Sequence, residues 1–203
     1  MKTMKSTTRP KPATERGAAL LELAFLLPLL VVMVLGVIDL GHLIHARLVV
    51  TNISREGGSL ASRGRGGTDA NVLAMLQSSA TPFDLANQGR IYITDIGAED
   101  TTATPPRMAP YVIRRVQGGS LSASSTVVGA VNGPLQSGLS PVMINHLSED
   151  PQTLTTNISG VTVVEVFYHY RPITPLPGFV QNLFPDNGGI IIGSRSVFQT
   201  GGR

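Results

Sequence analysis

The most unusual chemical setting belongs to Glu22, the single charged residue in the apolar run from Ala18 to Ile38. A carboxylate in such a run needs a partner, because an unpaired buried charge costs on the order of 3–5 kcal/mol. Gly17 precedes the run, so a protease that cut between Gly17 and Ala18 would create a positive amine at residue 18. That amine would lie one helical turn from Glu22 of its own chain, or it could meet Glu22 of a neighbouring chain. The simpler alternative is that Glu22 lies near a membrane interface and reaches toward water.

The run that contains Glu22 has the length and composition of a membrane-spanning helix. Residues 18–38 would extend about 32 Å as a helix, close to the thickness of the hydrocarbon core of a bilayer. The apolar side chains outweigh the cost of one acid, which is roughly 3 kcal/mol. A cleaved secretory signal peptide is the competing interpretation, but its apolar core is usually shorter, and Ile44-His45-Ala46 is a poor cleavage site.

Charge predicts how this helix is oriented. Residues 1–17 hold five basic side chains and one acid, a charge of +4, and residues 18–203 carry −1, which gives the net charge of +3 of the whole chain. Basic residues stay on the cytoplasmic side of a membrane, so we expect residues 41–203 on the opposite side. The nearly neutral remainder lacks the basic patch that nucleic-acid binding requires.

Composition also excludes several kinds of active site. The chain has 203 residues and no cysteine, which removes disulfides, thiolate metal sites and cysteine nucleophiles. All three lysines precede residue 12, so a P-loop and a lysine base are excluded from the rest of the chain. The G-x-S-x-G and H-E-x-x-H motifs are absent. We therefore predict no catalytic residue, no metal, no cofactor and no small-molecule substrate.

Basic leader, glycine, four apolar residues, glutamate and apolar helix form the pattern of type IV prepilins. The segment resembles most closely the TadE-like group, the minor pilins or pseudopilins of the tight-adherence (Flp) pilus. Two positions depart from that group: Leu23 replaces the usual aromatic residue, and Asp39 stands where glutamate is common. The resemblance covers residues 16–62 and rests on Arg16-Gly17-Ala18, Glu22, Leu27-Pro28-Leu29-Leu30, Gly36 to Gly41, and Asn52 to Gly57.

The resemblance implies both a processing step and a role in assembly. A prepilin peptidase would cut between Gly17 and Ala18, and the chain would span the bacterial inner membrane once, with its N-terminus cytoplasmic and its C-terminal domain periplasmic or extracellular. Its partners would be the membrane, the peptidase, other pilins and the pilus assembly machinery, and it would have no enzymatic activity. One alternative is a membrane-anchored extracytoplasmic binding module or adhesin unrelated to pili. An anchored hydrolase would need a triad that the sequence does not display.

The helix is expected to continue beyond the membrane. Pro28 removes one backbone hydrogen bond and should kink the helix near Ala24. From Leu40 onward the apolar residues become one-sided, which predicts an amphipathic half that carries the globular domain. We expect Arg63 to Gly67 to end the helix. The members of the predicted apolar side are Leu40, Leu43, Ile44, Leu48, Ile53 and Leu60.

These features predict four segments: a cleaved basic leader at 1–17, a transmembrane helix at 18–40, its amphipathic continuation at 41–62, and an extracytoplasmic α+β domain at 63–203. In the domain, a short helix is expected from Thr68 or Asp69 through Ser78, and another within Leu135 to Leu147. Four runs rich in β-branched and aromatic residues predict strands, namely Arg90 to Ile96, Tyr111 to Val116, Val161 to Arg171 and Ile190 to Phe198.

The predicted fold class is therefore α+β: a long N-terminal helix packed on a mainly antiparallel sheet, in the lollipop plan of pilins. In the third strand run, Val164, Val166, Tyr168 and Tyr170 share a face, which we expect to cover the helix. The proline-rich segment 172–179 should end that strand, either as a plain connector or as a loop that contacts partners.

The spacing of the histidines argues against metal binding and hydrolysis, and favours ordinary structural or surface roles. His42 and His45 are three residues apart on the predicted helix, but a metal ion would need a third ligand that no nearby cluster supplies. His146 is close in sequence to Ser148, Glu149 and Asp150, yet proximity along the chain is not the geometry of a hydrolytic site.

Overall fold

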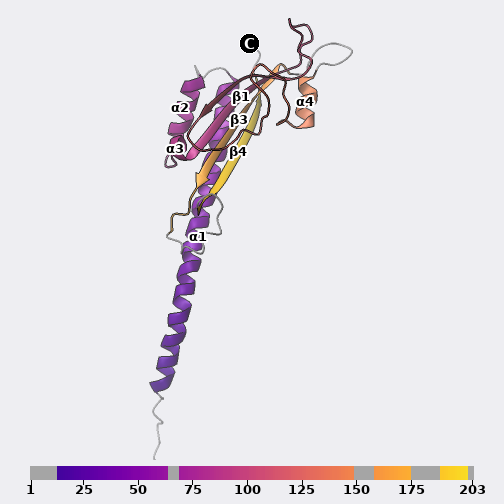
Figure 1. The fold of residues 1–203 in the computed structure, drawn as a ribbon. Helices are drawn as coiled ribbons and strands as arrows, with labels where there is room; N and C mark the ends of the chain where they lie inside the picture. The colour runs from indigo at the N-terminus through magenta and orange to yellow at the C-terminus, as the bar shows by residue number, and fades with distance from the viewer. Residues whose placement is uncertain (1–12, 64–68, 149–157, 175–187, 201–203) are drawn as a thin grey trace, which may run out of the picture.

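The structure, a computed structural model, describes residues 13–63, 69–148, 158–174 and 188–200. A long helix carries an α+β domain around its upper half, while its lower half projects away from the domain (Figure 1). This confirms the predicted fold class. The elements, in chain order, are α1 Ala13–Ser62, α2 Asp69–Ser79, α3 Leu85–Gln88, β1 Gly89–Gly97, β2 Tyr111–Gly118, α4 Pro141–Leu147, β3 Gly160–Tyr170 and β4 Ile190–Gln199.

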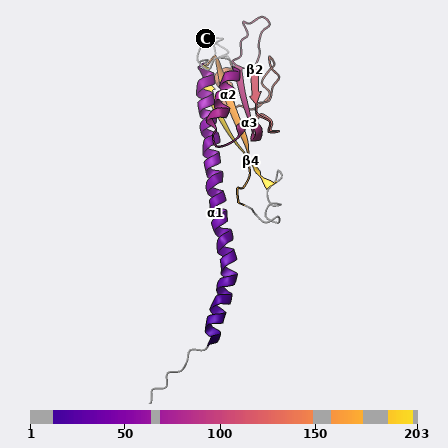
Figure 2. The same ribbon diagram turned by 90° about the vertical axis from the view of Figure 1, so that its left-hand side faces the viewer.

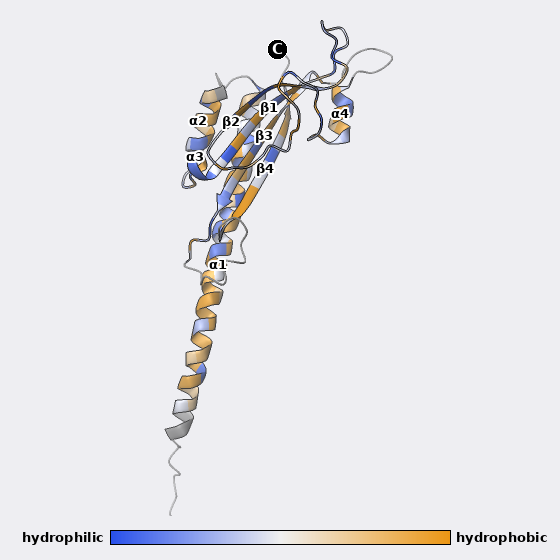
Figure 3. Cartoon of the chain, in the orientation of Figure 1, coloured by the Kyte–Doolittle hydropathy of each residue, from blue (hydrophilic) through white to orange (hydrophobic). Residues whose placement is uncertain are grey.

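Helix α1 is a single unbroken element of 50 residues, about 75 Å long at 1.5 Å per residue. It begins at Ala13, before the predicted start at Ala18, and it passes through Pro28 without interruption. Apolar residues dominate its projecting half, whereas polar residues are frequent in the half beside the domain (Figure 3). The predicted terminator lies partly at residues 64–67, which are outside the described residues.

The sheet has four strands in the order β2-β1-β3-β4, and every neighbouring pair is antiparallel. Each strand lies within three residues of its predicted bounds, because β-branched runs bordered by glycine and proline are strong signals. The four-residue helix α3, which Asp84 caps, is too short for periodicity to reveal, and the sequence analysis missed it.

One face of the sheet packs against the upper half of α1, with α2 beside it (Figure 2). The predicted face of β3 is confirmed, since Val164, Val166, Tyr168 and Tyr170 all lie in this core. The helix contributes mostly small side chains, which let its backbone approach the sheet closely. These residues are Ala46, Val50, Ile53, Ser54, Gly57 and Ala61.

The predicted apolar side of α1 was therefore wrong for half of its members. Of its members, only Ile53 is buried, and Leu43 and Leu60 are partly buried. Leu40, Ile44 and Leu48 keep 55%, 53% and 57% of their surface exposed. The physical reason is that close helix–sheet contact selects small residues, so the largest apolar side chains do not mark the docked side.

The opposite face of the sheet is also covered, which the sequence analysis did not anticipate. The segment after β2 and helix α4 form a second core with Val161 and Val163. Glu165, only 1% exposed, points to this face and accepts hydrogen bonds from the hydroxyls of Ser125 and Thr126 and from the Thr126 amide at 3.0 Å. A buried carboxylate with these donors attaches an otherwise irregular segment to the sheet.

Replacing Gly57 by alanine should destabilise the domain by about 1–3 kcal/mol, because overpacking a close contact forces its neighbours to shift. A Cβ atom at residue 57 would lie 2.7 Å from Leu76 Cδ1 and 3.3 Å from Val164 Cγ1, both on buried side chains. The measurement is urea unfolding of the full chain in detergent micelles, followed by tyrosine fluorescence. Gly41→Ala is the matched control, since its Cβ would meet nothing within 4 Å. Equal stabilities of the two variants would contradict this packing.

Candidate functional site

The candidate site is the exposed half of α1 together with the contacts at its upper end. Among the described residues, one helix is long and apolar enough to cross a membrane, and none of its most apolar window is buried. Residues 17–34 are exposed throughout. This stretch therefore has the surface of a single-pass membrane anchor, as its composition predicts.

Gly17, Ala18 and Glu22 all lie within the first turns of α1. Ala18 and Glu22 are four residues apart, so they share one side of the helix at a rise of about 6 Å. A side chain built at Gly17 would meet no atom within 4 Å. The fold of the isolated chain does not require glycine at this position, so any requirement for it must come from another molecule.

Pro28 lies in the middle of the exposed stretch. Its ring removes the hydrogen bond that would otherwise reach the carbonyl of Ala24. Helix α1 nevertheless continues on both sides, and the kink stays a prediction.

Asp39 joins the helix to the domain, a role that the sequence analysis missed. Its Oδ1 accepts hydrogen bonds from the amides of Ile173 and Thr174 at 2.9 and 3.2 Å, and its Oδ2 accepts one from the Thr174 hydroxyl. The hydroxyl of Tyr170 also donates to the Asp39 carbonyl oxygen at 2.9 Å. We call this set of contacts the Asp39 latch.

The Asp39 latch marks where the exposed apolar stretch meets the polar edge of the domain. It attaches the segment that follows β3 to helix α1. The point of attachment is Asp39, the residue directly after Ile38. Burial, and then the nearby charge of Asp39, raises the pKa of Tyr170, so its hydroxyl remains protonated and able to donate. The rest of the proline-rich segment, from residue 175, lies outside the described residues. Two features noted separately in the sequence, Asp39 and the segment after Tyr170, are thus parts of one contact.

The histidines do not form a metal site within the described part of the chain, which contains no cluster of three potential ligands. His42 and His45 are exposed, and the ring of His45 lies 5.4 Å from that of Phe83. His146 is exposed on α4, while Glu149 and Asp150 lie outside the described residues.

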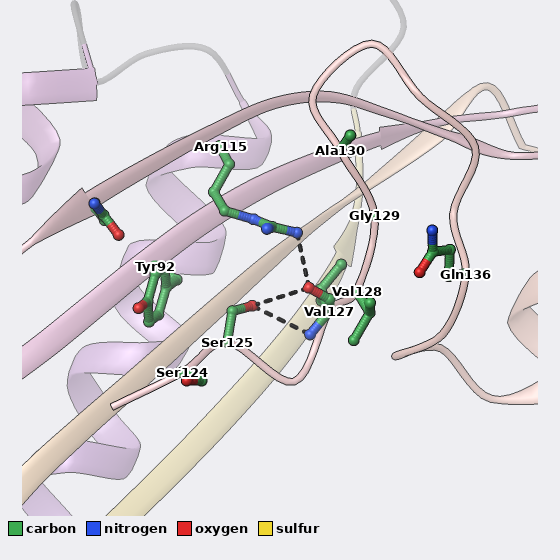
Figure 4. A pocket seen from close by; sticks show the side chains of 10 residues that line it. Tyr92, Arg115, Ser124, Ser125, Val127, Val128, Gly129, Ala130 and Gln136 are labelled. Atoms are coloured by element: carbon green, nitrogen blue, oxygen red, sulfur yellow. Dashed lines mark hydrogen bonds between the residues drawn. The ribbon is translucent and has the colours of Figure 1, made fainter. Parts of the chain in front are cut away.

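An open pocket of about 480 Å³ lies between the β1–β2 edge and the segment around residues 124–136 (Figure 4). Its polar groups bind that segment: the Tyr92 hydroxyl donates to the Ala123 carbonyl at 2.6 Å, and Arg115 Nη2 donates to the Val127 carbonyl at 2.8 Å. The described lining residues include no histidine or carboxylate. The polar groups of the pocket therefore attach the segment to the sheet, and this attachment explains them without a catalytic role.

Comparison with known proteins identifies only the N-terminal part of the chain. Residues 17–59 match the family model described as TadE-like protein. This segment is TadE-like. The match confirms the resemblance noted in the sequence for this part of the chain. No curated protein and no solved structure matches the chain.

The TadE-like segment contains two successive parts of α1 with different environments. Its first part is the exposed apolar stretch, and its second part holds most of the small residues that dock on the sheet, from Ala46 to Gly57. Asp39, the centre of the Asp39 latch, lies between the two parts. The segment thus contains both the anchor and the surface to which the domain attaches.

Replacing Asp39 by alanine should free the chain after β3. We expect hydrogen exchange at the Ile173 and Thr174 amides to accelerate about tenfold or more, because hydrogen bonds to a charged acceptor contribute about 1.5–3 kcal/mol. Native-state exchange with mass spectrometry on the full chain measures this. The Thr102 and Ala103 amides donate hydrogen bonds to Asp100 in the same way, so they serve as the internal control. Their exchange rates should not change. Unaltered exchange at residues 173 and 174 would contradict the latch.

Proposed function

We propose that this chain is a minor pilin or pseudopilin that a prepilin peptidase processes between Gly17 and Ala18, and that it acts in the assembly or function of a tight-adherence pilus. The observation that supports this most directly is a fully exposed apolar half-helix with one acid, Glu22, inside a TadE-like segment. The match begins at Gly17, beside the proposed cut. The domain would then lie in the periplasm or outside the cell, and the chain would need no catalytic activity of its own.

The proposed mechanism is charge compensation followed by helix packing. Cleavage would leave a positive amine on Ala18, one turn from the Glu22 carboxylate, so the two charges could neutralise each other in an apolar environment. The apolar surface of α1 could then leave the lipid and pack among the helices of other pilins. The domain, attached along the upper half of α1 and by the Asp39 latch, would face outward.

The competing function is a membrane-anchored extracytoplasmic binding module or adhesin that is unconnected with pili. It shares the anchor and the domain but predicts an uncut chain and no dependence on Glu22. N-terminal sequencing of the natively produced protein separates the two functions, because only the first predicts Ala18 as the first residue.

Replacing Gly17 by phenylalanine should leave the leader attached, because the peptidase would have to accommodate a bulky residue beside the cut bond. The fold itself should not change, since residue 17 has open space around it. Intact-mass spectrometry of the membrane-extracted protein distinguishes the cut and uncut chains. Gly36→Phe is the matched control, because Gly36 also lies on exposed α1 with nothing within 4 Å, and that variant should be cut normally. Efficient cleavage of Gly17→Phe would argue against the proposed site.

Replacing Glu22 by glutamine should preserve membrane insertion but reduce incorporation into the pilus or piliation itself. Insertion should persist because an uncharged side chain lowers the cost of the apolar environment. Membrane fractionation measures the first property, and the yield of sheared pili measures the second. Glu56→Gln is the control, since Glu56 is exposed on the same helix beside the domain. Normal piliation with Glu22→Gln would remove the role assigned to Glu22.

A further inference from the structure

The end of the sheet where β3 stops and β4 starts carries exposed apolar side chains. Ile173, three residues after β3, keeps 63% of its surface exposed, and Ile191, the second residue of β4, keeps 37%. Ile190 opens β4 opposite Tyr170, and this end of the strand is apolar (Figure 3). Arg171, directly after β3, is exposed as well. We call Arg171, Ile173, Ile190 and Ile191 the lower edge of the domain.

The Asp39 latch fixes the height of the lower edge relative to the membrane. If residues 18–38 fill the hydrocarbon core, Asp39 lies about 1.5 Å beyond its boundary. The Ile173 amide donates to Asp39 Oδ1 at 2.9 Å. Because an aspartate carboxylate extends about 3.5 Å from its Cα, the Ile173 nitrogen lies within about 7 Å of the Asp39 Cα. The headgroup layer on each side of a bilayer is about 5–7 Å thick, so the backbone of Ile173 lies in or beside that layer.

This position identifies lipid as the occupant of the exposed Ile173 surface. Single exposed isoleucines are ordinary on water-facing surfaces, so exposure alone indicates no contact. Ile173, however, is bonded through its own amide to the first residue after the membrane-length apolar stretch of α1, none of whose most apolar window is buried. The surface of α1 that lipid must cover therefore continues directly onto Ile173. Arg171 suits the same layer, because a long cationic side chain can lay its apolar stem along lipid and extend its charge to the phosphates.

We propose that the lower edge of the domain rests on the surface of the bilayer in which α1 is anchored, with the Ile173 side chain inserted where the headgroups meet the acyl chains. The partner is a phospholipid surface, which offers an apolar layer to Ile173 and phosphates to Arg171. The domain then stands directly on the membrane, attached to it both through α1 and through the segment after β3. This contact depends on the membrane anchor alone. It needs neither the proposed cleavage after Gly17 nor the proposed role of Glu22.

Tryptophan fluorescence tests the lipid contact, because the chain has no tryptophan of its own. Ile173→Trp is introduced into the full chain, which is reconstituted in phosphatidylcholine nanodiscs with or without bromine atoms on the acyl chains near the headgroups. The substitution leaves the Asp39 latch in place, since the latch uses the backbone amide of residue 173. Met108→Trp is the matched control: Met108 is 73% exposed and lies in the β1–β2 connection, at the opposite end of the sheet. The length of β3 separates the two ends by about 33 Å.

Brominated lipid should quench Ile173→Trp about threefold or more as strongly as Met108→Trp, and iodide in the water should quench the two variants in the reverse order. Equal quenching of the two variants by brominated lipid would overturn the proposal. So would a tryptophan at residue 173 that is shielded from iodide but unaffected by brominated lipid, because protein, such as a second copy of the chain, would then cover it. Neither the peptidase nor a pilus takes part in the measurement. An uncut native chain, which would contradict the proposed function, therefore leaves this test intact.

Discussion

One helix must satisfy two environments, and the rest of the structure follows from that constraint. From Gly17 to Ile38, α1 presents an almost uninterrupted apolar surface on all sides, which is stable only in lipid or among other apolar helices. Above Asp39, the same helix must bury one side against a sheet and tolerate water on the others. The change occurs within a single unbroken element, so the position of the membrane and the position of the domain are mechanically linked.

The attachment of the domain depends on small residues of α1 and on the carboxylates of two acidic residues. Along the upper half of α1, the sequence from Ala46 to Gly57 lets the sheet approach closely, and Ser54 reaches the hydroxyls of Ser194 and Ser196 at 3.0 and 2.9 Å. Acids then hold irregular segments in place through hydroxyl and amide donors. Asp39 does this for the chain after β3, and Glu165 for the segment after β2. Both irregular segments are thereby attached to regular elements without a disulfide.

This arrangement explains why a match confined to residues 17–59 still informs the architecture of a longer chain. The TadE-like segment holds the anchor, the branch point at Asp39 and most of the docking surface for the sheet.

Sequence alone determined the local features: the membrane-length helix, four strands, α2, α4 and the face of β3 that meets the helix. These follow from periodicity and composition, which act over a few residues. Only the tertiary structure decided which side of α1 docks, because close packing favours small residues such as Ala46 and Gly57 that carry no strong hydropathy signal. It also decided the partners of Asp39 and Glu165, since the Asp39 latch joins residues 134 and 135 positions apart. Contacts at such separations depend on strand order and register, which no local pattern specifies.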